Sequence, residues 1–200
     1  MLVDGLRRIV FNFTVVLSVT SSALAANTLQ TYRDGEFKFR ISYPEKWILL
    51  KSVGQNTRFS IRSPSGTPLA TCNIIVRKMP ESISMTQLQI NSEINEKILS
   101  PEEAQSIIAG GLKEAHLVES KTSQINNFPG HFGVVERYNQ TLDSKIFSRE
   151  MKFITFTPGL TWSLMCGAAG IRQPSAKDAY HYWESTFRDI LGSFLFEAGQ

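Results

Sequence analysis

The segment FKFRISYPEKW, residues 37–47, contains the pattern that decides the fold. Phe37, Phe39 and Ile41 alternate with polar residues, as they do in a strand that buries one face. The YPEK tetrapeptide at 43–46 predicts a turn at the end of this strand. Working outward, the same alternation and further turn residues predict three more short strands, at 47–53, 57–63 and 70–78. Four short strands in sequence indicate an antiparallel meander.

Two helices are predicted after this strand set. Ser84 is the expected N-cap of the first, and Ser100, Pro101 and Glu103 match the capping box and first turn of the second. The first helix has a broad apolar side formed by Leu88, Ile90, Ile94, Ile98 and Leu99.

A second strand set and a closing helix complete the chain. The strands are predicted at 117–125, 132–140, 145–156 and 160–168. Ser175 and Asp178 are the expected caps of the helix, whose core stripe consists of Tyr180, Trp183, Phe187, Ile190, Leu191 and Phe194. Strands, helices, strands and a final helix, in this order, indicate an α+β fold with an antiparallel sheet and helices packed on its faces.

The first residues have the features of an export signal. Arg7 and Arg8 form a basic start, residues 9–19 form an apolar run, and Ala23–Ala25 is an A-x-A cleavage site. The run is about 11 residues long, far shorter than the ~20 residues of a membrane-spanning helix. The expected organisation is a signal peptide at 1–25, a flexible lead-in at 26–36 and a single domain at 37–196. The protein is therefore expected to be exported, either periplasmic or secreted.

Composition limits the classes of function. Without the predicted leader, 175 residues remain, with 19 basic and 17 acidic side chains. This length suits one domain with a substantial core. A charge so close to balance, in an exported protein, excludes a dedicated nucleic-acid binder.

Cys72 and Cys166 are the two cysteines of the chain. In an oxidising compartment an even pair suggests a disulfide. Closing a loop of about 93 residues would stabilise the fold by roughly 4 to 5 kcal/mol in the chain-entropy model. The alternative is two separate buried thiols that pack as small apolar residues.

The residues that usually carry catalysis are sparse. His116, His131 and His181 are the only histidines, and none has the spacing of metal ligands. His131 is near Glu136 in sequence, which by itself is weak evidence for an acid–base pair. The sequence contains neither a G-x-S-x-G elbow nor a phosphate-binding loop. It therefore predicts no catalytic residue, no metal site and no cofactor.

Charge is distributed unevenly along the chain. Residues 26–80 contain nine basic and three acidic side chains, whereas residues 81–119 contain two basic and seven acidic ones. Strand alternation directs four cations of the first segment to solvent, and these form a candidate binding strip: Lys38, Arg40, Arg58 and Arg62. Such a strip suits an acidic protein surface or peripheral contact with an anionic membrane. The alternative is a solvated face that keeps a sheet edge unpaired.

Three motifs in order resemble the Mog1/PsbP-like superfamily: F-x-I-x-Y-P-x-x-W at 39–47, W-x-L-x-C at 162–166 and F-x-x-I-x-x-S-F at 187–194. The resemblance covers about residues 37 to 196 and is to an exported bacterial member, of the DcrB type or related to PsbP. It implies an antiparallel sheet sandwiched by helices, and proteins that act mostly by binding other proteins. It transfers no active-site residue to this chain.

These observations indicate an exported, non-enzymatic binding or accessory protein of the cell envelope, which acts through contact with a protein partner. Two alternatives remain open. One is a small-molecule or lipid carrier with a cleft between sheet and helices. The other is a hydrolase, which would need a pocket that gathers a histidine, a carboxylate and a hydroxyl.

Overall fold

The computed structural model describes residues 28–51, 54–111, 114–140 and 145–197. The predicted signal peptide at 1–25 lies outside these residues. The helices are α1 (Gln87–Glu96), α2 (Pro101–Ala109) and α3 (Gln173–Gly192), with a short 3-10 turn at Pro80–Ser82. The strands are β1 (Leu29–Asp34), β2 (Phe39–Pro44), β3 (Ile48–Leu49), β4 (Thr57–Arg62), β5 (Ala70–Lys78), β6 (Ala115–Ile125), β7 (Phe128–Gln140), β8 (Lys145–Thr157), β9 (Leu160–Gly170) and β10 (Leu195–Phe196).

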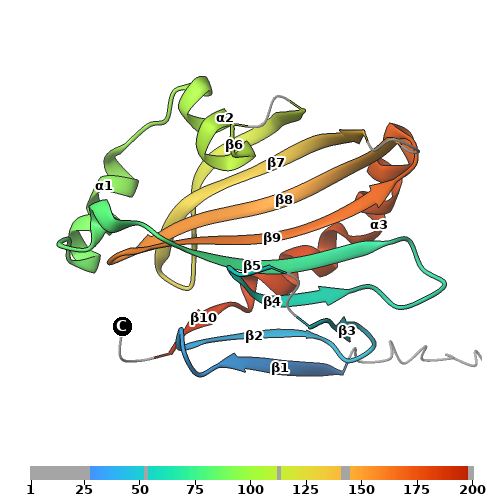
Figure 1. The fold of residues 1–200 in the computed structure, drawn as a ribbon, viewed down its shortest axis with the longest axis horizontal. Coiled ribbons are helices and arrows are strands. Elements are labelled where there is room, and N and C mark those ends of the chain that lie inside the picture. Colours follow the sequence, from blue (N-terminus) through green and yellow to red (C-terminus); the bar gives the residue numbers. More distant parts are fainter. Residues whose placement is uncertain (1–27, 52–53, 112–113, 141–144, 198–200) are drawn as a thin grey trace, which may run out of the picture.

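Most of the described strands form one large antiparallel sheet with the order β3-β4-β5-β9-β8-β7-β6. The early strand β5 pairs with the late strand β9 in this order, so the two strand sets of the sequence meet there. A small sheet has the order β1-β2-β10 and lies next to β4 (Figure 1). The predicted α+β architecture, an antiparallel sheet with helices on its faces, is confirmed.

Helix α3 covers one face of the large sheet, and Figure 1 shows it passing behind β5 and β9. Tyr180, Phe187 and Ile190 of α3 pack in one core with Trp162 and Leu164 of β9, and each of the five is at most 1% exposed. The small sheet closes the side of this core with Phe39, Ile41 and Tyr43. The apolar stripe predicted for the last helix therefore does form the core, as its spacing of three and four indicates.

A disulfide joins the two central strands inside this core. Cys72 of β5 lies directly opposite Cys166 of β9, and their sulfur atoms are 2.06 Å apart. Both cysteines are buried. The predicted bond is confirmed, and it links the N-terminal and C-terminal strand sets where they meet.

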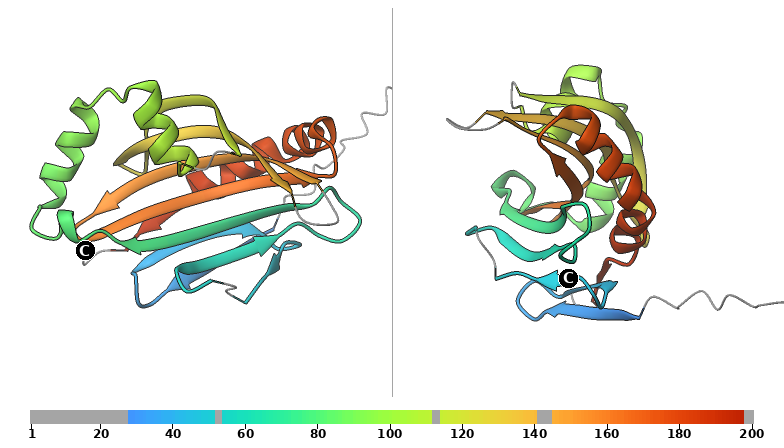
Figure 2. Two further views of the ribbon diagram at one scale, coloured as in Figure 1. Left: turned by 45° about the horizontal axis from the view of Figure 1, so that its top comes forward. Right: turned by 90° about the vertical axis from the view of Figure 1, so that its right-hand side faces the viewer.

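Helix α2 covers part of the opposite face. Its residues Ala104 and Ile108 form a second, smaller core with Val135 of β7. Gly133 permits the close approach, because a Cβ atom there would lie 2.8 Å from a methyl group of Ile108. Helix α1 stands beyond one end of the sheet (Figure 2). The large sheet is therefore covered by α3 over β5, β9 and β8 on one face, and by α2 over β6 to β8 on the other.

The prediction of a flexible lead-in at 26–36 is wrong for Leu29–Asp34, which form the strand β1. Leu29–Asp34 pairs with β2 in antiparallel register, and Tyr32 packs against Phe39 and Phe59. The predicted meander is also wrong at its start, because β2 pairs with β1 and β10 rather than with β3. The strand that pairs with β2 on its other side, β10, follows α3 near the end of the described chain. A local sequence pattern does not reveal a pairing between segments so far apart.

Element ends also differ from the predictions. Helix α1 is capped by Thr86, not Ser84, with a complete capping box to Gln89. Two residues of its predicted apolar side, Leu88 and Ile98, are exposed. The box that Ser100 and Glu103 were predicted to form at α2 is present. Helix α3 begins earlier than predicted, at Gln173, so Ser175 lies in its first turn and bonds to the backbone of Arg172. The strand predicted at 47–53 contains only Ile48–Leu49 within the described residues.

Candidate functional site

The face of the large sheet opposite α3, here called the open face, is the less covered of its two faces. Alternate residues of β9 from Trp162 to Ala168 are buried against α3, whereas Thr161, Ser163 and Met165 between them are half-exposed. Strand β5 shows the same alternation, with Ile75 half-exposed and Arg77 exposed. Helix α2 packs over β6 to β8, so β9 and β5 present the polar side chains of Thr161, Ser163 and Arg77 next to its C-terminal end.

An ion cluster lies on the open face where the cover by α2 ends. Glu150 and Lys152 of β8 face Arg137 of β7, and Glu150 is 3.4 Å from Arg137 and 3.5 Å from Lys152. The Nζ of Lys152 donates to the backbone carbonyl of Ile108 at 3.3 Å, and Ser148 donates to Glu150 at 3.0 Å. The side chain of Lys152 is only 7% exposed. A lysine so deeply buried needs nearby acceptors, and here they come from a carboxylate and a helix C-terminus.

Burial is the largest influence on Lys152, and it lowers the pKa of the ammonium below the ordinary 10.5. Glu150 opposes this change, whereas the charges of Arg137 and Arg77 add to it. The Nε of Arg137 is itself buried, with no hydrogen-bond partner among the described residues. Three cations thus meet one carboxylate in this part of the described structure. We call Arg77, Arg137 and Lys152 the basic cluster.

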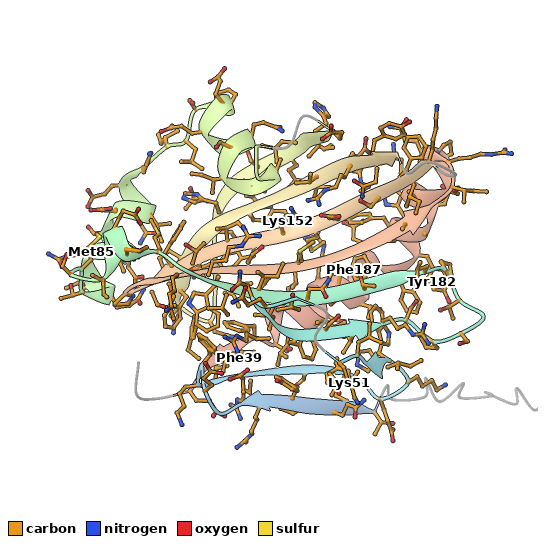
Figure 3. The ribbon with its side chains drawn as sticks, in the orientation of Figure 1. Phe39, Lys51, Met85, Lys152, Tyr182 and Phe187 are labelled. Atoms are coloured by element: carbon orange, nitrogen blue, oxygen red, sulfur yellow. A yellow bond between two sulfur atoms is a disulfide. The ribbon has the colours of Figure 1, made fainter. Side chains whose placement is uncertain are left out.

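A cavity of about 330 Å³ opens beside the basic cluster. Its polar lining consists of the basic cluster with the hydroxyl residues Thr161 and Ser163. Its apolar lining comes from the C-terminal end of α2 and from the open face: Ile75, Ile107, Ile108, Ala109, Gly110, Ile154 and Met165. Figure 3 shows Lys152 near the middle of this face, below α2. A cavity with cations on one part of its wall and aliphatic groups on the rest can hold a small ligand.

The four residues of the predicted strip lie on two different sheets. Lys38 directly precedes β2 and Arg40 lies on it, in the small sheet, whereas Arg58 and Arg62 lie on β4 of the large sheet. Arg58 is 3.1 Å from Glu36 and stacks over the ring of Phe37. Lys38, Arg40 and Arg62 are exposed. Arg58 is therefore the member of the strip with its charge already compensated.

Strand β1 adds a cation that the sequence interpretation missed. Arg33 lies directly opposite Arg40 on neighbouring antiparallel strands, and both are exposed. Glu197 is 3.7 Å from Arg33. We call Arg33, Lys38 and Arg40 the small-sheet basic patch. The alternation of Arg33 with Tyr32 and Asp34, which are more buried, is typical of a strand and could have placed Arg33 on an exposed face. The prediction instead assigned this segment to the flexible lead-in.

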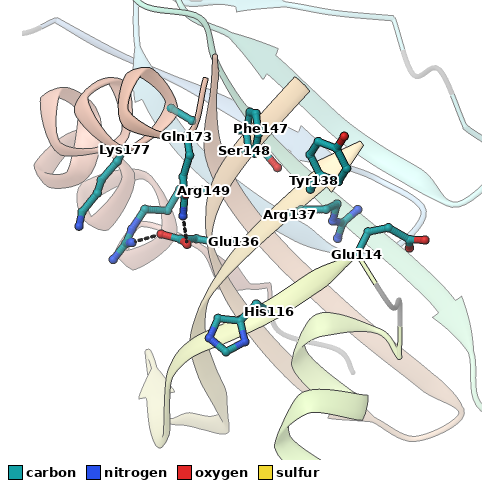
Figure 4. A pocket seen from close by; sticks show the side chains of 11 residues that line it. Glu114, His116, Glu136, Arg137, Tyr138, Phe147, Ser148, Arg149, Gln173 and Lys177 are labelled. Atoms are coloured by element: carbon teal, nitrogen blue, oxygen red, sulfur yellow. Dashed lines mark hydrogen bonds and ion pairs between the residues drawn. The ribbon is translucent and has the colours of Figure 1, made fainter. Parts of the chain in front are cut away.

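A second cavity, of about 250 Å³, gathers the side chains that a hydrolase would need (Figure 4). It is lined by His116, Glu136 and Ser148 among others. However, Glu136 is ion-paired with Arg149 and accepts a hydrogen bond from Gln173 at 3.1 Å.

The hydroxyl of Ser148 is directed to Glu150, a member of the ion cluster on the open face. Figure 4 shows His116 well apart from Ser148. The three groups are therefore not arranged as a nucleophile with its base.

The other histidines have structural surroundings. His131 is 4% exposed, and burial lowers the pKa of its imidazole, with a smaller contribution from Lys97. Glu136 is bonded to Arg149 and Gln173 instead, so the acid–base pair considered for His131 does not form. His181 is exposed and lies 3.3 Å from Glu184 on α3. Within the described residues, no group of three or more histidine, cysteine or acidic side chains could hold a metal, and no helix is long and apolar enough to cross a membrane.

Comparison with known proteins supports the fold. A scan against protein-family models finds no match, and a search of curated proteins finds no similar sequence. Among solved structures, a variant of the protein Mog1 aligns with 86% of this chain and 97% of its own, at 9% identity and a TM-score of 0.51. LpqN, involved in cell envelope biogenesis of Mycobacterium tuberculosis, aligns with 84% of this chain and 89% of its own, at 10% identity and a TM-score of 0.50. The chain has a Mog1/PsbP-like fold.

The cyanobacterial PsbP of Synechocystis sp. PCC 6803 also aligns, with 87% of this chain and 95% of its own, at 13% identity and a TM-score of 0.49. The resemblance noted in the sequence motifs is supported at the level of the fold by the alignments with Mog1 and LpqN. Identities this low transfer no residue roles, so the function of this Mog1/PsbP-like domain depends on its own surfaces.

Proposed function

We propose that this protein is an exported, non-enzymatic binding or accessory protein of the cell envelope, and that it acts through contact with an acidic surface of another protein. The contact is made by the small-sheet basic patch, with Arg62 and Arg58 of β4 as the outer part of the surface. This retains the strip predicted from the sequence and adds Arg33 to it.

The observation that carries the proposal is the pairing of Arg33 with Arg40. Like charges directly opposite each other on antiparallel strands destabilise a sheet by roughly 0.2 to 1 kcal/mol. Glu197 offsets this only in part, because its one carboxylate lies 3.7 Å from Arg33 and faces two cations. Carboxylates of a partner would remove the repulsion, so the same residues that weaken the free protein would favour the complex.

Two further observations support the location and class. A buried disulfide is typical of proteins that fold in an oxidising compartment. LpqN, which shares the fold, is described as involved in cell envelope biogenesis. The non-enzymatic character is supported by the separation of His116 from Ser148, because the cavity lined by these two residues lacks an activated nucleophile.

Photo-crosslinking in the native envelope tests the proposal. A benzoylphenylalanine at Thr31, an exposed β1 position, would capture a partner bound to the patch. Capture should fall with added salt and should be lost in the variant Arg33→Gln/Lys38→Gln/Arg40→Gln. The same variant should be as stable as the wild type or more so in urea unfolding, since it removes the cross-strand repulsion.

A matched control carries the same change in net charge elsewhere, as Lys46→Gln/Lys145→Gln/Lys177→Gln. It should retain the captured protein. Equal capture by the control and the patch variant would disprove the role of the patch, as would the absence of any captured protein. A separate variant, Arg58→Gln/Arg62→Gln, should weaken capture less, because Arg58 is already paired with Glu36.

A further inference from the structure

We propose that the cavity beside α2 is a binding site for a small organic anion, whose carboxylate or phosphate contacts the basic cluster and whose apolar body lies along the open face. This site is distinct from the small-sheet basic patch and does not depend on it. At about 330 Å³ it is at the lower end of the range for small-molecule sites.

The first argument is charge. Arg77, Arg137 and Lys152 line the cavity, and the carboxylate that compensates them among the described residues is Glu150. Lys152 also contacts the carbonyl of Ile108, which supplies a partial negative charge from the end of α2. Two positive charges remain in excess. An incoming anion would meet cations that burial has already stripped of much of their water.

The second argument is that the ion cluster is not fully hydrogen-bonded. The Nε of Arg137 and the Oε2 of Glu150 are both buried without a hydrogen-bond partner among the described residues, which is costly for charged groups. Glu150 lies 3.4 Å from this guanidinium, so it compensates the charge without a short hydrogen bond. Arg77 is exposed at the rim of the cavity. The cluster thus offers one lysine and two guanidinium groups, and guanidinium groups match the planar oxygens of carboxylates or the oxygens of phosphates.

The third argument is the rest of the wall. Ile75, Ile154 and Met165 present aliphatic surface next to the cations, and Ser163 adds a hydroxyl. A free inorganic anion would leave this aliphatic surface in contact with water. A molecule with an anionic head and an apolar body would use both parts of the wall. The ligand class is therefore an amphiphilic acid of modest size.

Isothermal titration calorimetry with four probes tests the site: octanoate, octyl phosphate, 1-octanol and octylammonium. Wild-type protein should bind octanoate or octyl phosphate at least tenfold more tightly than 1-octanol, because the alcohol has no charge to meet the basic cluster. Octylammonium should bind most weakly. The ratio between octanoate and octyl phosphate tells which headgroup the cluster prefers. Amide shifts at Ser163 and Met165 in NMR titrations should place the probe in the cavity.

Variants make the test specific. Lys152→Met keeps the shape of the side chain and should reduce the preference for octanoate over 1-octanol to less than threefold. Arg77→Met, at the exposed rim, should weaken octanoate severalfold without affecting folding. The matched control Lys145→Met, on the same strand but outside the cavity lining, should bind as the wild type does. The patch variant Arg33→Gln/Lys38→Gln/Arg40→Gln should also bind octanoate normally.

Three results would overturn the proposal: equal affinity of the wild type for octanoate and 1-octanol, no binding of either anion, or an undiminished preference in both Lys152→Met and Arg77→Met. Because the patch variant keeps this site intact, failure here leaves the proposed protein contact unaffected. Loss of partner capture, in turn, leaves the anion site unaffected.

Discussion

The two faces of the large sheet differ in what they bury. The α3 face holds aromatic rings and the disulfide, with Trp162, Phe187 and Cys166 all inaccessible to solvent. The open face holds charges and hydroxyls, with Lys152 and Glu150 under the edge of α2. Figure 3 labels Phe187 on the helix behind the sheet and Lys152 on the strands in front. The difference indicates that the α3 face contributes most of the apolar burial that stabilises the fold. The open face can therefore keep polar and charged side chains that suit a binding site.

The largest effect is expected from the α3 face. Phe187→Ala removes a ring that contacts Trp47 and Tyr180 in a closed core. The free energy of unfolding should fall by about 4 kcal/mol, from lost transfer energy and from the cavity left behind. The matched change on the open face is Ile154→Ala, which should cost about half as much, because that residue borders an existing cavity that the surroundings can fill.

Urea unfolding of both variants measures this contrast. Equal losses at Phe187 and Ile154 would mean that the two faces of the sheet contribute alike to the free energy of unfolding, which would contradict the contrast drawn above. A larger loss at Ile154 would mean that the open face contributes more.

The disulfide is the next largest contribution. The double variant Cys72→Ala/Cys166→Ala should lower the free energy of unfolding by about 3 kcal/mol, because the unfolded chain regains the entropy of a long loop. Addition of reductant to the wild type should approach the same value in a thermal melt. If the variant and the wild type melt together under oxidising conditions, the bond is not stabilising the α3 face.

A substitution of Glu150 tests how much the carboxylate in the ion cluster of the open face contributes to stability. Glu150→Gln leaves Lys152 and Arg137 without their shared carboxylate, so the free energy of unfolding should fall by about 2 kcal/mol. Lys152→Met should change it by less than about 1 kcal/mol, since Glu150 keeps Arg137 as a partner. Denaturant unfolding of the two variants measures this asymmetry. Equal losses would show that Lys152 and Glu150 act only as a pair, and that Arg137 does not depend on this carboxylate.

Much of the fold follows from local sequence patterns. The alternation in β5 and β9 assigns their buried faces correctly, and the capping residues of α2 fix its start. The pairing of β2 was not predictable in this way. It depends on β10, which returns from the far end of the chain, and on β1, whose buried residues are only Tyr32 in part and Asp34.

The basic cluster was visible in the sequence only in part. Glu150 and Lys152 are two of the four charged residues of β8, and they lie on the opposite face from Met151 and Phe153. Alternation along β8 places these two charges on one face, but it does not show that they are buried. Arg77 and Arg137, however, come close to Lys152 only because β5, β9, β8 and β7 pair in this order and register. The periodicity of a single strand does not predict the register between strands. The strip was predicted from alternation along single strands, so it joined cations from two different sheets.

The smallest effect is expected from a change of pH. The free energy of unfolding should change with pH in opposite directions for the buried titratable groups of the two faces. Burial lowers the pKa of Lys152, so the folded protein loses this proton before the unfolded chain does as pH rises toward 10.5. The unfolded state then binds more protons, and stability rises with pH. On the α3 face burial raises the pKa of Tyr180 to about 12, so its contribution is constant below pH 10 and is lost only above it. As pH rises up to about 10, Tyr180 stays protonated in both states while Lys152 titrates in the folded protein, so the two groups can be separated there.

Unfolding free energies of the wild type and Lys152→Met across that interval check the sign. The difference between them should shift in favour of the wild type as pH rises, by less than the loss expected for Glu150→Gln. Tyr180→Phe should follow the wild type over the same interval, because Tyr180 remains protonated in both states there. A difference that stays flat, or that shifts toward Lys152→Met, would mean that water reaches Lys152 freely, and this ammonium group would then not be buried on the open face.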